Sequence, residues 1–246
     1  MNFAKQPKDI HILLVDDDED FRNILTFSFQ RKGYQVSSAS GGREAMKIVR
    51  AQPIDVVISD IRMPEGDGIE LLDQLKDYEI KTPIVLLVTG FADISTEEAY
   101  DRGAEALFSK PFDRKSVEEN IHRLLTPPAE RWSQARDQLS IELQIKLQCP
   151  DLPSAIKTRA ISIGRGGMFL KLEDQFPNIS DEVAFNIITD DNQLKGAGIV
   201  RWVRSNSSNE AGSGCGIEFS YLAESARKQI LEILEASKIK AYITKK

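Results

Sequence analysis

The chain has 246 residues, of which 41% are hydrophobic, and it carries 32 basic and 38 acidic side chains for a net charge of −6. This length is sufficient for two domains of ordinary size, and the hydrophobic content excludes a wholly disordered chain. The modest negative charge argues against a protein that coats nucleic acid or acidic membranes. The charge is divided unevenly, because residues 1–126 have a net charge of −7 and residues 127–246 a net charge of +1.

Segments that would place the chain outside the cytoplasm are not found in the sequence. No stretch approaches the roughly 18 apolar residues of a membrane span, and the N-terminus has no apolar signal segment. The two cysteines, Cys149 and Cys215, do not form a disulfide framework and are expected to be reduced thiols. We therefore expect a cytoplasmic protein with no membrane insertion.

Short apolar runs alternate with segments of helical spacing between residues 10 and 125. The expected strands are Ile10–Val15, Tyr34–Ser38, Ile54–Ser59, Ile84–Val88 and Ala106–Ser109. The expected helices are Asp20–Arg31, Gly41–Ala51, Ile69–Tyr78, Ser95–Arg102 and Arg114–Leu125. This alternation predicts a doubly wound α/β fold with a five-stranded parallel sheet. Because Pro127 and Pro128 stop the last helix, we expect a first domain over residues 1–126 and a linker over residues 127–130.

After the linker the hydrophobic pattern changes to a period of two residues. The expected strands are Leu139–Gln148, Ala155–Ile163, Met168–Leu172, Glu182–Thr189, Leu194–Val203 and Cys215–Phe219. This pattern predicts an antiparallel six-stranded β-barrel over residues 131–246, with a terminal helix at Glu224–Ser237. Trp132 and Trp202 are expected to be core or interface residues. The basic end formed by Lys238, Lys240, Lys245 and Lys246 is expected to be solvated.

Polar side chains follow four of the strands expected in the first domain. Asp16 and Asp17 follow the first strand, Asp60 follows the third, Thr89 the fourth and Lys110 the fifth. All of them fall at the carboxyl ends of parallel strands, where such sheets build their sites. Converging carboxylates need a hard cation, and Mg²⁺ prefers oxygen ligands. We expect Asp60 to attack a phosphoryl group and form an aspartyl phosphate whose oxygens Thr89 and Lys110 contact.

Five sequence motifs in this order resemble those of the response-regulator receiver domain over residues 9–125. They are Val15-Asp16-Asp17, Ser59–Pro64, Asp67-Gly68, Val88-Thr89-Gly90 and Ser109–Phe112. The resemblance implies a flavodoxin-like fold, a histidine kinase or phosphotransfer protein as partner, and Asp60 as the phosphoacceptor. The Mg²⁺ ligands that it implies are Asp16, Asp17, Asp60 and the backbone carbonyl of Arg62.

The same resemblance makes Thr89 and Lys110 the switch and phosphate-sensing residues. It also makes the Lys110–Pro111 peptide bond a candidate for the cis form. One position departs from the family, because the aromatic residue that is common three positions before the lysine is Leu107 here. The acidic residues Asp18–Asp20 are interpreted as a helix start that complements the helix dipole.

The second half resembles a PilZ domain over roughly residues 129–236. The matching pieces are Arg131–Arg136, Ser162–Leu170, Gly198–Arg204, Gly216–Phe219 and the closing helix. Proteins of that family bind cyclic di-GMP through arginines before the first strand and a short D/N-x-S-x-x-G turn. The candidate nucleotide-binding residues here are Arg131, Arg136, Ser162, Arg165 and Gly167.

The ligand motif of this second half is degenerate. When Gly166 and Gly167 are aligned with the motif, Ser162 stands where Asp or Asn is usual and Gly164 where Ser is usual. When Ser162 is aligned with the motif serine instead, Ala160 takes the Asp/Asn position and Arg165 the glycine position. Counting back from Arg136, the earlier arginine is expected at Trp132. A hydrogen bond lost to an uncharged ligand group costs about 1 kcal/mol, or about fivefold in affinity. Two alternatives therefore stay open: the domain binds cyclic di-GMP, or it is a protein-interaction adaptor that has lost this binding.

The sequence as a whole predicts a response regulator and not an enzyme. Mg²⁺-dependent phosphorylation of Asp60 is expected to control a PilZ-like output that acts on an unknown downstream protein. No helix-turn-helix pattern follows the first domain, so we expect no DNA binding.

Overall fold

A computed structural model describes residues 5–64, 66–90, 93–133, 141–157, 160–173, 176–205 and 212–245. The chain divides into two compact units. The first unit comprises Met1–Ser95 and Arg102–Thr126, and the second comprises Thr96–Asp101 and Pro127–Lys246.

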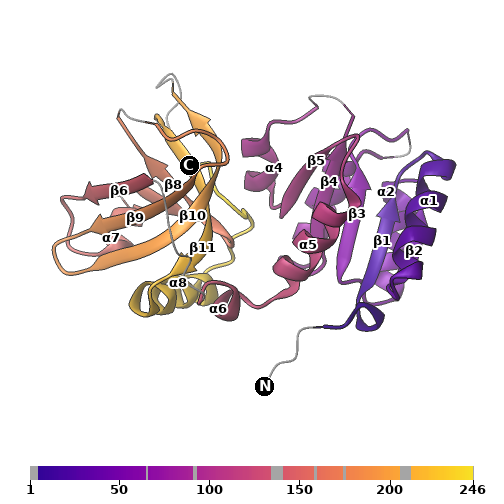
Figure 1. Cartoon of the computed structure of the whole chain (residues 1–246), viewed down its shortest axis with the longest axis horizontal. Coiled ribbons are helices and arrows are strands. Elements are labelled where there is room, and N and C mark those ends of the chain that lie inside the picture. Colours follow the sequence, from indigo (N-terminus) through magenta and orange to yellow (C-terminus); the bar gives the residue numbers. More distant parts are fainter. Residues whose placement is uncertain are drawn as a thin grey trace. The chain divides into compact units, whose positions relative to one another are not determined.

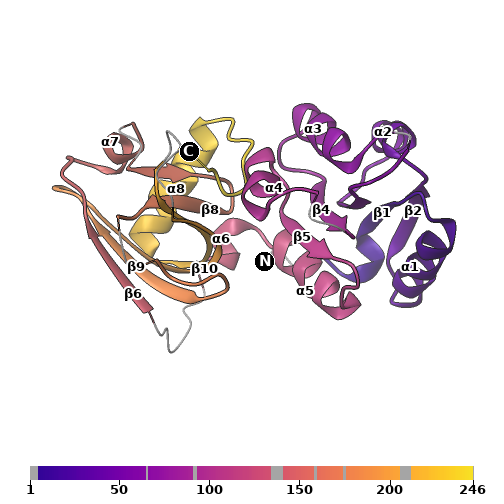
Figure 2. The same ribbon diagram turned by 90° about the horizontal axis from the view of Figure 1, so that it is seen from above.

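The first unit contains a five-stranded parallel sheet with the strand order β2-β1-β3-β4-β5. Helices α2 and α3 lie on one face of this sheet and helices α1 and α5 on the other (Figures 1 and 2). The predicted doubly wound, flavodoxin-like fold is therefore confirmed. The elements up to residue 126 are the 3₁₀ helix Pro7–Asp9, β1 (His11–Val15), α1 (Glu19–Arg31), β2 (Gln35–Ala39), α2 (Gly42–Ala51), β3 (Val56–Asp60), α3 (Gly68–Tyr78), β4 (Ile84–Thr89), α4 (Thr96–Arg102), β5 (Ala106–Ser109) and α5 (Arg114–Leu125). Of these, α4 is grouped with the second unit except for its last residue, Arg102.

The burial of the central strands accounts for their continuous apolar sequences. All residues of β3 and β4 are buried, as expected for central strands that are covered by helices on both faces. Strand β2 lies at the edge of the sheet and buries only Ala39 fully. The Asp18 side chain accepts a hydrogen bond from the amide of Phe21 and caps α1, which confirms the predicted acidic helix start.

A buried ion pair crosses the first unit between α3 and the loop before β5. The Lys76 ammonium lies 2.9 Å from a carboxylate oxygen of Glu105, and both side chains are almost fully buried. Lys76 also donates to the carbonyl of Pro83, while the second Glu105 oxygen accepts from the amide of Val85 at 2.7 Å. The pair thus satisfies backbone groups as well as its own charges, as buried ions require.

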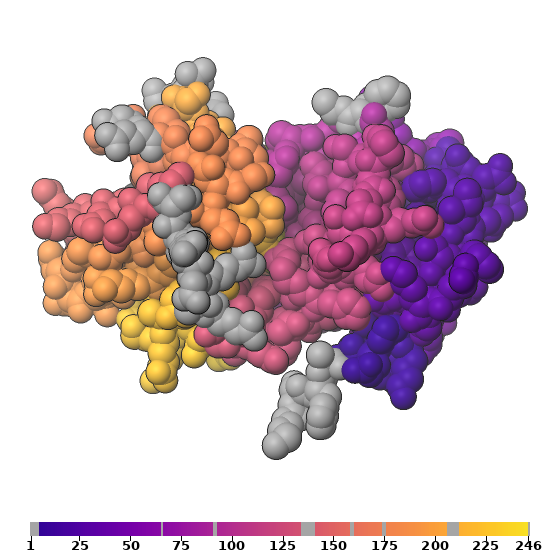
Figure 3. Space-filling view, viewed as in Figure 1, coloured from indigo at the N-terminus to yellow at the C-terminus, as the bar shows by residue number. Residues whose placement is uncertain are grey.

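The second unit is built around a curled six-stranded sheet with the strand order β6-β9-β10-β11-β8-β7. Helix α8 packs against β10 and β11 (Figure 2), and its outer side forms part of the yellow surface in Figure 3. The predicted six-stranded β domain with a terminal helix is confirmed, although its sheet is a curled half-barrel and not a closed barrel. Its elements are α6 (Pro128–Arg131), β6 (Ile141–Lys146), α7 (Leu152–Lys157), β7 (Ile161–Ile163), β8 (Gly167–Lys171), β9 (Glu182–Ile188), β10 (Gln193–Arg204), β11 (Gly214–Leu222) and α8 (Glu224–Ala236).

One strand pair of this sheet is not antiparallel. Strand β6 pairs with β9 in the parallel direction, whereas the pairs that β10 forms with β9 and β11 are antiparallel. Strands β6 and β9 are separated along the chain by α7 and the β7–β8 hairpin. A connection of this length allows parallel pairing, which a tight hairpin does not.

One local prediction in the second half was wrong. The strand expected over Ala155–Ile163 is replaced in its first part by helix α7, and only Ile161–Ile163 form a strand. The Asp151 side chain accepts a hydrogen bond from the amide of Ser154 at 2.8 Å and so favours a helical turn at this point. Helix α6 begins within residues 127–130, where a linker was predicted, and Pro128 occupies a first-turn position that tolerates proline.

Both tryptophans pack as predicted, inside the second unit. Trp132 is fully buried, packs edge-to-face against Phe219 with 5.4 Å between ring centroids, and accepts the amide of Leu222 on its carbonyl. Trp202 is buried and stacks on Phe169. The Trp132–Phe219 pair belongs to the hydrophobic core of the half-barrel.

The end of the chain differs from the predicted solvated tail. Tyr242 and Ile243 are buried, at 2% and 0% exposure, although lysines surround them in the sequence. Cys149 and Cys215 are both buried free thiols, as expected. Among the helices that the structure describes, none combines the length and apolar character needed to cross a membrane.

Candidate functional site

The ends of four parallel strands place the predicted pocket residues together. Val15 of β1 is in register with Ser59 of β3. The next residue of each chain segment, Asp16 and Asp60 respectively, therefore lies at the same edge of the sheet. Asp60 is in register with Val88, and Thr89 with Ser109, which brings Lys110 to the same edge. This edge lies at the topological switch point of the sheet, where ligand sites of such folds form.

The Lys110 ammonium forms ion pairs with two carboxylates at this edge. It lies 2.8 Å from a carboxylate oxygen of Asp16 and 2.8 Å from one of Asp60, and both aspartates are buried. The ammonium also lies over the ring of Phe21, 4.5 Å from its centroid. The Lys110–Pro111 bond is cis, as predicted. The structure therefore joins three of the predicted site residues through direct ionic contacts.

The charges in this pocket shift the pKa values of its groups in opposing ways. Burial raises the pKa of Asp60, and the Asp16 carboxylate adds to this effect, while the bond to Lys110 opposes it. For Lys110, burial lowers the pKa, but the bonds to Asp16 and Asp60 outweigh it, so the net shift is upward. The lysine cation thus compensates the two buried carboxylates.

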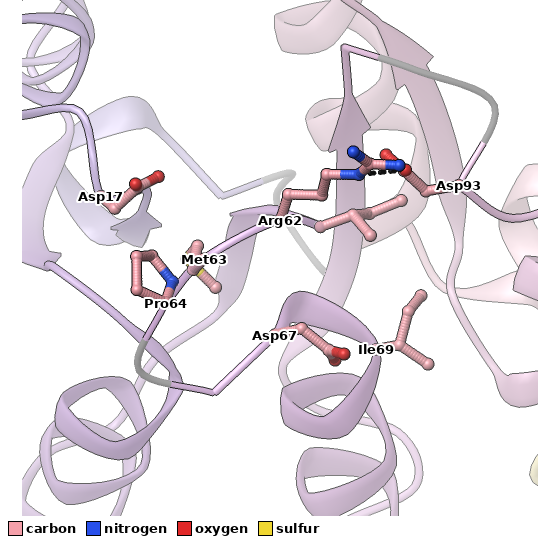
Figure 4. A pocket seen from close by; sticks show the side chains of 8 residues that line it. Asp17, Arg62, Met63, Pro64, Asp67, Ile69 and Asp93 are labelled. Atoms are coloured by element: carbon pink, nitrogen blue, oxygen red, sulfur yellow. Dashed lines mark hydrogen bonds and ion pairs between the residues drawn. The ribbon is translucent and has the colours of Figure 1, made fainter.

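Asp17 and Arg62 lie in a neighbouring pocket of about 530 Å³ (Figure 4). Its other lining residues are Ile61, Met63, Pro64, Asp67, Ile69 and Asp93. The amide of Arg62 donates to Asp60 at 3.1 Å, so this pocket adjoins the predicted phosphoacceptor.

The oxygen ligands that the sequence assigns to Mg²⁺ are not gathered around one point. Within the described ranges, no three carboxylate, imidazole or thiol side chains are grouped closely enough to hold a metal ion. Lys110 bridges Asp16 and Asp60, and Asp17 is exposed. The donor set is nevertheless composed of carboxylate and carbonyl oxygens, which fits Mg²⁺. Binding of the ion at this set therefore requires these side chains to rearrange.

Asp93 is a pocket residue that the sequence did not reveal. Its side chain accepts a hydrogen bond from the Thr89 hydroxyl at 2.8 Å and pairs with the Arg62 guanidinium (Figure 4). The hydroxyl of the predicted switch residue Thr89 is therefore hydrogen-bonded to a loop carboxylate, while its backbone carbonyl accepts from the amide of Lys110 at 2.7 Å. Asp93 belongs to no recognisable motif, and its place four residues after Thr89 was the sole available signal.

The candidate nucleotide-binding residues of the second unit lie mainly in the β7–β8 hairpin. Ser162 is buried in β7, Gly167 begins β8, and Arg165 lies half-buried in the turn between them. Arg131 ends helix α6 with its guanidinium 5.6 Å from the ring centroid of Trp132. Arg136 lies outside the described residues.

The comparisons with known proteins agree with both resemblances. The family model of the response regulator receiver domain matches residues 12–122, and that of the PilZ domain matches residues 130–236. The regulatory protein AtoC of Escherichia coli strain K12 is 37% identical over 115 residues, which are 46% of this chain and 25% of AtoC. The response regulator SaeR of Staphylococcus aureus strain USA300 is 30% identical over 132 residues, which are 54% of this chain and 58% of SaeR.

Among solved structures, response regulator protein TrrA from Thermotoga maritima, in complex with Mg²⁺ and BeF, is 28% identical and superposes with a TM-score of 0.41 over 47% of this chain and 98% of TrrA. The chain thus spans a quarter of the length of AtoC and somewhat more than half of that of SaeR. The chain thus contains a response regulator receiver domain at residues 12–122, followed by a PilZ domain at residues 130–236.

Proposed function

We propose that this protein is a phosphorylation-controlled signalling protein and not an enzyme. A histidine kinase or phosphotransfer protein transfers a phosphoryl group to Asp60, and the PilZ domain transmits the signal to a downstream protein. The observation that carries this proposal is the pair of buried carboxylates of Asp16 and Asp60 around the Lys110 ammonium, at the switch point of the sheet.

The chemistry of this pocket suits phosphoryl transfer. A carboxylate oxygen of Asp60 attacks the phosphorus atom, and the bond from phosphorus to the leaving group of the donor breaks. The Lys110 ammonium pairs with a phosphoryl oxygen, and the Thr89 hydroxyl donates to another once it leaves Asp93. A bound Mg²⁺ ion at Asp16, Asp17, Asp60 and the Arg62 carbonyl would neutralise charge that develops during the transfer.

A labelling experiment tests the proposal directly. We expect the wild-type chain to gain one phosphoryl group from acetyl phosphate in the presence of Mg²⁺, measured by intact mass. The Asp60→Asn variant should gain none, because an amide cannot serve as the nucleophile. The matched control is Asp77→Asn, which alters an exposed carboxylate of α3 that does not line the adjoining pocket, and it should still be labelled. Equal labelling of wild type and Asp60→Asn would refute the proposed phosphoacceptor.

Removal of the lysine cation should strengthen Mg²⁺ binding. In Lys110→Ala the site loses a positive charge that lies 2.8 Å from two proposed ligands, so repulsion of the ion disappears. Two unit charges 4 Å apart near a protein surface interact by about 4 kcal/mol, and after a discount for solvent screening we expect about tenfold tighter binding. Calorimetric titration with Mg²⁺ measures the effect.

The control for this experiment is Lys115→Ala, which removes an exposed cation of helix α5. It should leave the dissociation constant for Mg²⁺ within about twofold of the wild-type value, because exposed charges are screened. Unchanged or weaker Mg²⁺ binding by Lys110→Ala would contradict the proposed metal site.

For the output, we favour cyclic di-GMP as a ligand of the PilZ domain. This choice is supported by the family match and by the position of Arg165 beside Gly167 in one hairpin turn. An arginine next to backbone amides suits an anionic nucleotide. The competing function is a protein-interaction adaptor without a nucleotide, and the buried position of Ser162 favours it. Calorimetric titration with cyclic di-GMP distinguishes the two functions, because only the first predicts binding.

A further inference from the structure

The C-terminal segment, defined here as Lys238–Lys245, follows helix α8 and returns to the β7–β8 hairpin. It contributes two buried side chains, Tyr242 and Ile243, to the second unit. Its place in the structure is therefore fixed by burial of apolar surface, although its sequence is basic.

The segment satisfies the backbone donors of the hairpin turn. The amide of Arg165 donates to the carbonyl of Ala241 at 2.9 Å, and the amide of Gly166 donates to the carbonyl of Tyr242 at 2.8 Å. The Arg165 guanidinium also donates to the carbonyl of Lys240 at 3.1 Å. The C-terminal segment thus accepts hydrogen bonds from the two turn amides and the guanidinium that an anion bound in this turn would use.

The side chain of Tyr242 covers the glycine at the tip of the turn. A Cβ atom on Gly166 would lie 2.1 Å from the Tyr242 ring. The ring therefore packs directly against the backbone of Gly166. A Cβ atom on Gly164 would likewise lie 2.4 Å from the Tyr242 carbonyl oxygen. A side chain at either position would therefore clash with the segment in this conformation.

A buried carboxylate fixes the far end of the tyrosine. The Tyr242 hydroxyl donates to Glu218 at 2.8 Å, and Glu218 is only 2% exposed. The other Glu218 oxygen binds the guanidinium of Arg201. Hydrogen bonds to a buried charged group are among the stronger ones in proteins, so this contact adds to the stability of the seated segment.

We propose that the C-terminal segment is an internal competitor for the nucleotide site, and that cyclic di-GMP binds only after Tyr242 leaves the β7–β8 turn. The proposal rests on the cyclic di-GMP binding proposed above. Its basis is that the segment uses the Arg165 guanidinium and the turn amides, next to the predicted ligand residues Ser162 and Gly167. Nucleotide and segment therefore exclude one another.

The expected effect on affinity follows from the competition. When the binding-competent form is only a fraction of the molecules, the apparent dissociation constant rises by the inverse of that fraction. Removal of a buried aromatic ring is one of the most destabilising changes to a packed segment. We therefore expect Tyr242→Ala to bind cyclic di-GMP at least tenfold more tightly than the wild type.

The test is calorimetric titration of cyclic di-GMP into the full-length wild type, into Tyr242→Ala and into a chain that ends at Ser237. The control is Tyr78→Ala, which removes an exposed tyrosine of α3 and should bind as the wild type does. Tyr242→Phe keeps the ring but loses the bond to Glu218, and it should give an intermediate affinity. If the shortened chain is unfolded by circular dichroism, the two Tyr242 variants decide the question.

A second measurement needs no nucleotide. Amide hydrogen exchange at Arg165 and Gly166 should be slow in the wild type and faster in Tyr242→Ala, because the carbonyl acceptors of these amides are in the segment. Fast exchange at both amides in the wild type would overturn the proposed occupancy.

The outcomes separate this inference from the proposed function. Equal cyclic di-GMP affinity in the wild type and both Tyr242 variants overturns the internal competitor and leaves nucleotide binding in place. No binding by any folded variant overturns both the competitor and the nucleotide ligand, and it supports the adaptor. Neither result bears on the labelling of Asp60, which tests the receiver domain separately.

Discussion

Replacement of Glu105 by alanine is expected to lower the free energy of unfolding of the first unit by about 3–5 kcal/mol, because the Lys76 ammonium would remain buried without its carboxylate. Both side chains are at most 2% exposed, so water cannot replace the lost partner. The amide of Val85 would lose its acceptor as well. Urea unfolding followed by far-ultraviolet circular dichroism, together with native-state hydrogen exchange of β4, measures the loss.

Two variants serve as controls for this prediction. Glu119→Ala removes the carboxylate of an exposed pair with Lys115 in helix α5 and should cost at most about 0.5 kcal/mol. The double variant Lys76→Met/Glu105→Gln removes both charges but keeps an acceptor for Val85, so it should be more stable than Glu105→Ala. A cost for Glu105→Ala no larger than that of Glu119→Ala would show that the buried pair does not stabilise the fold.

Replacement of Trp132 by alanine is expected to destabilise the second unit by about 3–5 kcal/mol. The indole is fully buried against Phe219, and its removal leaves a large cavity where the chain enters the half-barrel. Thermal and urea unfolding followed by circular dichroism would show the second unit unfolding first. A mild effect would mean that the neighbouring side chains collapse into the cavity.

The control for Trp132 is Ile179→Ala, which truncates an apolar side chain that is 62% exposed. It should change the free energy of unfolding by less than about 0.5 kcal/mol, because an exposed side chain has little buried surface to lose. The contrast between the two variants separates core packing from a general sensitivity of this unit to substitution.

The first unit could be predicted from the sequence in most respects. Its central strands are buried on both faces and therefore appear as continuous apolar runs, and the rule that sites form at the carboxyl ends of parallel strands placed Asp16, Asp60 and Lys110 at one edge. The Thr89–Asp93 contact escaped this reasoning, because it depends on the conformation of a loop. Lys76 was likewise missed, since a lysine in a helix is normally solvated.

The second unit was harder to predict because its decisive contacts are distant in sequence. The apolar residues near Ala155 fit a strand as well as a helix, and the cap at Asp151 favoured the helix. The lysines at the chain end indicated a solvated tail, whereas Tyr242 is buried by contact with Gly166 and Glu218. Charge composition alone cannot reveal that a single aromatic residue has a binding site elsewhere in the chain.

The burial of Trp132 also explains one departure from the PilZ pattern. The position where the family places an arginine faces the core here, and the neighbouring Arg131 carries the positive charge. An arginine in that buried position would be an unpaired charge in an apolar core, which costs several kcal/mol. The burial of Trp132 thus gives a packing reason for the offset of one residue.

The placement of the two tryptophans has a practical consequence. Trp132 and Trp202 are the sole indoles of the chain, and both belong to the second unit. Selectively excited indole fluorescence is therefore blind to the receiver domain and reports on the PilZ domain alone. A change in emission when Asp60 is phosphorylated would reveal communication between the two domains in the unlabelled protein, in real time.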